Sequence, residues 1–296
     1  MNSSQILLNA VLFAMIFSVA LDLKPADFVR VAKRPLPVIA GLIAQFLLLP
    51  IATFIATLIL DLPANIEAGM LLVAACPCGS LSNFVTHYSR GNTALSVSIT
   101  AVANVIALIM TPTNFAWMVA NNPNTAAWLK EIAVDPGMIW INLAIILALP
   151  LTLGLLTRHY FPAFSDKVRR PMGQFAVAAL FAFVIVALVR DRHMFLMGIG
   201  GLLVIVVLHN ATGLAIGYAS GALARLSHAD RKALTFETGM QNSGLALAII
   251  GSQFDADVGM VIVAGLWGTW HIVSGFSLAH YWRSRTIRNE ACLTQE

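Results

Sequence analysis

Long apolar segments, with most charged residues confined to their ends, run through almost the whole of this chain. We place nine of them at about residues 5–22, 36–60, 65–88, 93–119, 137–158, 171–189, 194–224, 232–252 and 257–282. A segment of about 20 apolar residues can cross the hydrocarbon core of a bilayer as a helix. Backbone polar groups in hydrocarbon must bond within their own segment, which favours helices. The sequence therefore predicts an all-α polytopic membrane protein with nine transmembrane helices.

The composition excludes several other classes of protein. The chain is 58% hydrophobic and 11% charged, with a mean hydropathy of +0.81, whereas soluble domains average about 25% charged residues. Its 296 residues leave no stretch for a separate soluble domain, so residues 1–296 are predicted to form one transmembrane domain. The sequence holds no basic arm or charged run, so the lipid bilayer and not nucleic acid is the expected partner.

Lysine and arginine residues are divided unevenly between the two sides that nine segments would create. Of the 18 Lys and Arg residues, all lie on one side except Lys130, Arg190 and Arg192. The positive-inside rule assigns the richer side to the cytoplasm. We therefore expect a cell-membrane protein, in the bacterial inner membrane, with its N-terminus outside and its C-terminus in the cytoplasm. The six tryptophans are expected to lie at the membrane interfaces.

Two of the nine segments are interrupted by residues that disfavour a continuous helix. Segment 65–88 contains Pro77 and Gly79, followed by Ser80, Ser82 and Asn83, and proline both lacks an N–H donor and clashes with the preceding turn. Segment 232–252 contains Gly239 and Gly244 on either side of Met240-Gln241-Asn242-Ser243. Each interrupted segment comes just before the apolar segment that ends its half of the chain.

These positions predict an inverted repeat. The first repeat spans about residues 5–119, a connecting helix about 137–158, and the second repeat about 171–282. Equivalent segments are five apart, an odd number, so they would cross the membrane in opposite directions. Secondary transporters built in this way bind ions and substrate where their discontinuous helices meet, near the midplane of the bilayer.

Glu237 lies in the second interruption, deeper in an apolar segment than any other acidic residue. An ionisable group in the bilayer costs a few kcal/mol and persists only with a partner. The nearest basic residue is Lys232 at the edge of the segment, and the next is Arg283, so a cation is the natural partner. With no second deep carboxylate and no histidine pair at metal-ligand spacing, the sequence disfavours an intramembrane enzyme and predicts no cofactor.

Several motifs resemble those of the bile acid:sodium symporter family. They are Cys76-Pro77-x-Gly79-x-x-Ser82-Asn83, Arg90-Gly91-Asn92-x-Ala94-Leu95-Ser96 and Glu237-x-Gly239-Met240-Gln241-Asn242-Ser243-Gly244-Leu245-Ala246. The resemblance implies a core domain with two crossed, discontinuous helices and a panel domain beside it. It also implies a sodium-coupled symporter that imports an organic anion, such as a bile acid or a smaller carboxylate like pantoate, by alternating access.

The same resemblance implies two sodium ions as coupling ions. The first site would use Ser82, Asn83, Ser96, Thr100 and Glu237. The second would use Gln45, Glu237, Thr238, Met240 and Gln241, with Thr238 and Met240 acting through their carbonyl groups. All of these residues can donate oxygen, the ligand that hard cations prefer.

Substrate contacts are expected from the starts of the half-helices and from polar residues nearby: Ser80, Asn242, Asn104, Asn114 and Cys78. Cys78 stands where the family often has a glycine, so its side chain is expected to reshape the substrate cavity and to affect substrate preference more than sodium affinity. One alternative is an efflux carrier for arsenite or another anion that uses the Cys78 thiol as a soft ligand. A sodium-binding sensor without transport and an intramembrane enzyme are further alternatives.

Overall fold

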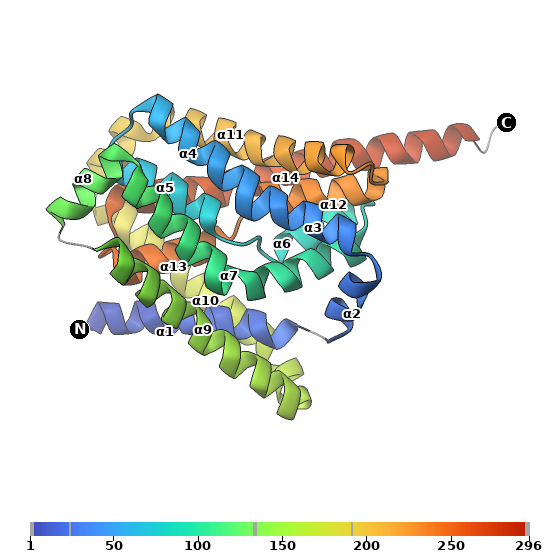
Figure 1. Cartoon of the computed structure of the whole chain (residues 1–296), viewed down its shortest axis with the longest axis horizontal. Coiled ribbons are helices and arrows are strands. Elements are labelled where there is room, and N and C mark those ends of the chain that lie inside the picture. Colours follow the sequence, from blue (N-terminus) through green and yellow to red (C-terminus); the bar gives the residue numbers. More distant parts are fainter. Residues whose placement is uncertain (1–2, 24, 133–134, 191, 294–296) are drawn as a thin grey trace.

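The computed structural model describes residues 3–23, 25–132, 135–190 and 192–293. Its helices are listed here in chain order: α1 (Ser3–Asp22), α2 (Pro25–Lys33), α3 (Pro35–Ile43), the π-turn η1 (Ala44–Leu48), α4 (Leu49–Leu60), α5 (Ala64–Ala75), α6 (Leu81–Tyr88), α7 (Thr93–Asn121), α8 (Pro123–Glu131), α9 (Pro136–Tyr160), α10 (Pro162–Arg190), α11 (Arg192–Leu223), α12 (His228–Gly239), α13 (Ser243–Gln253) and α14 (Val258–Leu293). These residues contain no strand, and the two ends of the chain lie at opposite ends of the molecule (Figure 1).

The helices confirm the predicted all-α membrane class. Five are long and apolar enough to cross a membrane: Pro35–Leu60, Thr93–Asn121, Pro136–Tyr160, Gly200–Leu223 and Val258–Arg285. Shorter apolar helices cover Asn9–Asp22, Ala64–Ala75 and Ser243–Gln253. The last two are halves of the two interrupted segments, and predicted segment 171–189 lies on α10. The number of nine crossings and the inverted repeat stay predictions.

Both predicted interruptions are present, and they meet. The first interruption separates helix α5 from α6, and the second separates α12 from α13. The Gly79 N–H donates to the Met240 carbonyl at 3.3 Å, and the Asn242 N–H donates to the Pro77 carbonyl at 2.8 Å. The two unwound segments therefore run antiparallel and hydrogen bond to each other. These bonds satisfy backbone N–H and C=O groups that have no partner within the broken helices.

A third irregularity, the π-turn η1, was not predicted. It ends two residues before Pro50, which has no N–H to donate to the Phe46 carbonyl one turn earlier. The Asn114 amide of α7 donates to that carbonyl at 2.8 Å instead. The irregular turn is thus supported from a neighbouring helix, and it carries Gln45 at a wholly buried position.

The first turns of the broken helices contact the opposite half of the chain. At one end, the Asn65 amide of α5 lies 3.5 Å from the Asp257 carboxylate, which caps the start of α14. At the other end, the Asn92 amide at the start of α7 donates to the Asp230 carboxylate of α12 at 2.6 Å. Each broken helix is therefore tied by an Asn–Asp pair to a helix from the other half.

Helix α11 packs directly on the backbone of α12 through glycines spaced four residues apart. A Cβ on Gly213 would lie 3.2 Å from the Thr238 carbonyl oxygen, and one on Gly221 would lie 3.2 Å from the Arg231 Cα. At Gly217, a Cβ would lie 2.8 Å from the Thr235 Cα. Small residues at this spacing let membrane helices approach closely, and here they position the helix that ends beside Glu237.

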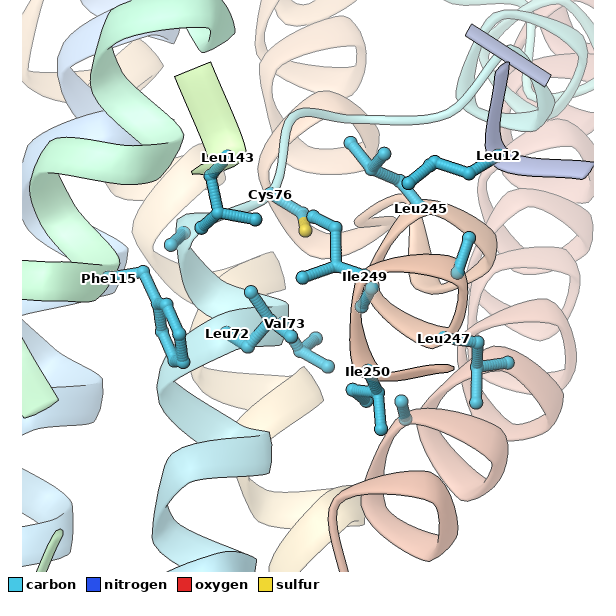
Figure 2. Packing of buried hydrophobic residues seen from close by; sticks show 14 of the residues in the cluster. Leu12, Leu72, Val73, Cys76, Phe115, Leu143, Leu245, Leu247, Ile249 and Ile250 are labelled. Carbon is cyan, nitrogen blue, oxygen red and sulfur yellow. The ribbon is translucent and has the colours of Figure 1, made fainter. Parts of the chain in front are cut away.

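The largest apolar cluster holds the broken helices against their neighbours. Figure 2 shows Leu72 of α5 and Ile249 of α13 packed with Phe115, Leu143 and Leu12, which come from α7, α9 and α1. All five side chains are at most 1% exposed. The cluster therefore joins the two half-helices, α5 and α13, to α1 and α9.

The assignment of all six tryptophans to interfaces is wrong for Trp267. Its side chain is fully buried on α14 and its ring lies 4.5 Å from that of His209. His209 in turn hydrogen bonds through Nε2 to the Thr53 hydroxyl at 2.7 Å. This part of the molecule is a packed contact between α4, α11 and α14.

Candidate functional site

The Glu237 carboxylate lies in the last turn of α12, fully buried, beside the point where the broken helices cross. The Ser82 hydroxyl of α6 donates to Oε1 at 2.7 Å, and the Thr100 hydroxyl of α7 donates to Oε2 at 2.9 Å. The Ser96 hydroxyl also donates to Oε1. Three helices from two distant parts of the chain thus converge on one carboxylate.

Asn83 completes this cluster. Its side-chain oxygen accepts from the Ser96 hydroxyl at 2.8 Å and from the Thr100 hydroxyl at 3.2 Å. The structure therefore brings together all five residues that the family resemblance assigned to the first sodium site. Their assignment as ion ligands stays a prediction.

The cluster contains more oxygen acceptors than it has protons to share. The single hydroxyl proton of Thr100 faces Glu237 Oε2, Asn83 Oδ1 and the Ser96 carbonyl oxygen, the last at 3.0 Å. Because each hydroxyl can also turn a lone pair outward, such a set fits a hard monovalent cation. Among the described residues, there is no group of three or more His, Cys, Asp or Glu side chains that could hold a metal ion.

The residues predicted for the second sodium site also lie near one another. The Gln45 amide lies 3.5 Å from Gln241 Oε1, and the Gln241 amide donates to the Thr238 carbonyl at 2.7 Å. The Met240 carbonyl accepts from Gly79 in the crossing. Gln45 Oε1 and Thr238 Oγ1 are buried without a hydrogen-bond partner, a state that costs about 1–3 kcal/mol per group. The predicted ligand of Thr238 is its carbonyl oxygen and not this hydroxyl, so the Gln45 oxygen is the unpartnered atom of the predicted set that a cation would satisfy.

The Cys78 side chain differs from its expected place. It is fully buried, and its thiol lies 2.6 Å from Glu237 Oε2 and 3.7 Å from the Thr100 hydroxyl. The thiol therefore belongs to the carboxylate cluster and not to the lining of the cavity described next. Cys76 lies apart from it in the apolar cluster (Figure 2), so the two thiols do not form a soft-ligand pair.

A cavity of about 30 Å³ lies between the crossing and the helices α1 and α9. Its polar lining includes Asn104 and Asn242, with Pro77 beside them, and its apolar lining includes Met15 and Leu147. Two of the predicted substrate residues, Asn104 and Asn242, are thus brought together.

Two other predicted substrate residues lie elsewhere. Ser80 is exposed at the start of α6. The Asn114 amide is used by the Phe46 carbonyl, so its place is explained by the π-turn. Neither residue is part of the lining of the cavity.

Sequence reasoning missed a second fully buried carboxylate, Glu67. Its side chain is 0% exposed in the first turn of α5, at the edge of the predicted segment 65–88, so it is buried within the protein. It accepts from the Leu62 N–H at 2.9 Å and from the Asn122 amide at 2.9 Å. A carboxylate near a helix N-terminus is stabilised by the helix dipole, and the signal in the sequence was its position three residues into a helix that follows Pro63.

This arrangement, in which two broken helices cross beside a buried, oxygen-rich carboxylate in a helical membrane protein, is that of an ion-coupled secondary transporter. The profile of the Sodium Bile acid symporter family matches residues 9–197. The chain therefore belongs to this family of sodium-dependent transporters.

Similar proteins are named as transporters too. The chain is 31% identical over 279 residues to the "Uncharacterized sodium-dependent transporter YocS" of Bacillus subtilis, covering 94% of this chain and 83% of that protein. It is 27% identical to the "Probable sodium/metabolite cotransporter BASS2, chloroplastic" of rice over 92% of this chain. It is 30% identical to the BASS1 protein of Arabidopsis thaliana over 85% of this chain. The matches span 63% and 60% of these two plant proteins.

Proposed function

We propose that this protein is a sodium-coupled symporter that imports an organic anion by alternating access. The observation that carries the proposal is the convergence of Ser82, Asn83, Ser96 and Thr100 on the Glu237 carboxylate. The buried, unpartnered side-chain oxygen of Gln45 supports a second ion beside it. The names of the similar proteins support sodium as the coupling ion.

Ion binding and anion binding would be linked through the crossing. Two sodium ions would offset the charge of Glu237 and bridge the elements that hold it, α6, α7 and α12. The half-helices α6 and α13 begin at this point, and their N-terminal ends carry partial positive charge that favours an anion. Bound sodium would thus hold the crossing in place and add positive charge where the anion binds.

The size of the cavity supports a moving structure. At about 30 Å³ it has room for roughly one water molecule, whereas a bile acid or a carboxylate such as pantoate is far larger. For the anion to enter, α1 and α9 would have to move away from α7 and α13. These elements would be the panel and the core that alternate between the two sides of the membrane, with the N-terminus outside and the C-terminus in the cytoplasm.

Replacement of Glu237 tests the proposal directly. We would measure the thermal stability of the purified protein in sodium chloride and in choline chloride, for the wild type and for Glu237→Gln. Ligand at 100 times its dissociation constant stabilises a protein by about 2.7 kcal/mol, so a sodium-specific rise in melting temperature is expected in the wild type and not in the variant. Glu67→Gln neutralises another carboxylate that is 0% exposed, so it is the matched control and should keep the rise.

Uptake of labelled pantoate and of a labelled bile acid into proteoliposomes then tests transport itself. Sodium-dependent accumulation by the wild type and its loss in Glu237→Gln are expected. Equal stability of the wild type in the two salts would contradict sodium binding. Sodium binding without exchange of any anion across the membrane would point to a sensor instead.

A further inference from the structure

A second cavity, of about 160 Å³, lies outside the carboxylate cluster, between α2 and the beginnings of α3 and α7. Its lining combines two arginines, Arg30 and Arg34, with the polar residue Asn92 and with the apolar residues Val38 and Leu95. Figure 1 shows α2 between α1 and α3, at the end of the molecule where α6 and α12 also lie. In the predicted topology, Arg30 and Arg34 belong to the side that is rich in lysine and arginine.

The two guanidinium groups have donors to spare. Arg30 Nη1 lies 3.3 Å from the Asp27 carboxylate and 3.5 Å from the Ser98 hydroxyl, and Arg34 Nη2 lies 3.5 Å from the Asp230 carboxylate. Each contact with a carboxylate is long and uses one nitrogen, although a guanidinium carries five N–H donors in a planar fork. The side chains are 45% and 66% exposed, so both can reach a further anion.

One side of α3 faces away from the protein, and it is the side opposite the buried Pro37 and Val38 that line the cavity. Leu36, Ile39 and Ile43 are 57%, 50% and 44% exposed. Because α3 starts a helix long and apolar enough to cross the membrane, these side chains are suited to lipid acyl chains. The basic cavity and this apolar surface therefore both lie at the start of α3, on opposite sides of the helix.

We propose that this cavity binds the headgroup of an acidic phospholipid of the cytoplasmic leaflet. The phosphate would accept hydrogen bonds from Arg30 and Arg34, and the acyl chains would pass around the start of α3 to lie along Leu36 and Ile39. Basic pockets between membrane helices on the cytoplasmic side recognise acidic lipids in this way. The proposal rests on the proposed orientation of the chain, and it is independent of what the protein transports.

The place of the cavity gives such a lipid a role. Helix α2 is the connection between α1, which lines the small cavity near the crossing, and α3, which continues through η1 to Gln45. A lipid bound to Arg30 on α2 and to Arg34 just before α3 would hold this connection. Acidic lipid would therefore affect how freely α1 moves relative to α3.

The test compares variants of the purified protein in nanodiscs and detergent. We would measure binding and thermal stability with phosphatidylglycerol, with zwitterionic phosphatidylcholine, and with soluble glycerol phosphate. The variants are Arg30→Gln and Arg34→Gln. Because the Arg34 side chain is mostly exposed, we expect Arg34→Gln to fold. Lys33→Gln is the matched control, because it removes the same charge from the last residue of α2, next to Arg34, but Lys33 does not line the cavity.

Phosphatidylglycerol is expected to bind and to raise the melting temperature, with about a fivefold loss of affinity for each arginine replaced and little loss for Lys33→Gln. An equal loss for all three variants would overturn the proposal, because it would indicate a diffuse surface charge effect. An equal shift with glycerol phosphate would overturn the choice of a lipid and assign the cavity to a soluble anion.

Discussion

The pairing of Cys78 with Glu237 brings a thiol proton to a carboxylate oxygen that we assign to an ion. The thiol lies 2.6 Å from Oε2, which the Thr100 hydroxyl also approaches, at 2.9 Å. A hydrogen bond to a charged group contributes about 1.5–3 kcal/mol. The thiol and the ion would therefore compete for one lone pair.

Removal of this competitor gives a prediction opposite to the one made from the sequence. We expect Cys78→Gly to lower the sodium concentration for half-maximal uptake by about three- to tenfold, since the lost hydrogen bond is worth roughly one factor of ten. The order of preference among anions should stay the same, because the side chain is not part of the cavity lining. Sodium titrations of uptake with two different anions measure both quantities.

Cys76→Ala is the control for this experiment. Its thiol is equally buried but lies in the apolar cluster, so its replacement should leave the sodium dependence unchanged. A changed order of preference among anions in Cys78→Gly, with an unaltered sodium dependence, would contradict this prediction. It would support the earlier assignment of Cys78 to the substrate cavity.

At the scale of the elements, the contact between α11 and α12 determines where Glu237 lies. The Gly217 backbone lies against the backbone of Leu234 and Thr235, so an added methyl group has no flexible neighbour to displace. We expect Gly217→Ala to destabilise the protein by about 1–3 kcal/mol, in the range typical of overpacking. The melting temperature in detergent, with and without sodium, measures the effect.

Gly200→Ala provides a matched control on the same helix. A Cβ at Gly200 would meet no atom within 4 Å, so this variant should be as stable as the wild type or slightly more stable, since alanine is the better helix former. Equal stability of both variants would contradict the close contact between α11 and α12.

The elements also illustrate what a sequence can reveal. The breaks at Pro77 and Gly239 were predictable, because proline and clustered polar residues inside an apolar segment disfavour a helix locally. The π-turn before Pro50 was not, because its compensating donor, Asn114, lies more than 60 residues away in the chain. The residues that cluster around Glu237 were predicted through motifs, whereas the direction of the Cys78 side chain depended on the packing of three helices.

At the scale of the whole molecule, two sodium ions carried with one monovalent anion would move net charge inward. Each charge that crosses 100 mV changes the energy by about 2.3 kcal/mol. We expect sodium-driven uptake of labelled pantoate or bile acid into proteoliposomes to accelerate when the interior is made negative with a potassium gradient and valinomycin. Equal rates with and without the potential would contradict this stoichiometry and indicate one sodium ion per anion.

The Asn–Asp pairs that tie each broken helix to the other half of the chain also concern how the protein is made. Helix α5 rests on Asp257 and on the Met260 backbone, because a Cβ on its Gly69 would lie 3.0 Å from the Met260 Cα. These partners are synthesised almost 200 residues after α5. During translation, the first half must therefore wait in the membrane with its broken helix incomplete, and final assembly can begin only when the last helix has left the ribosome.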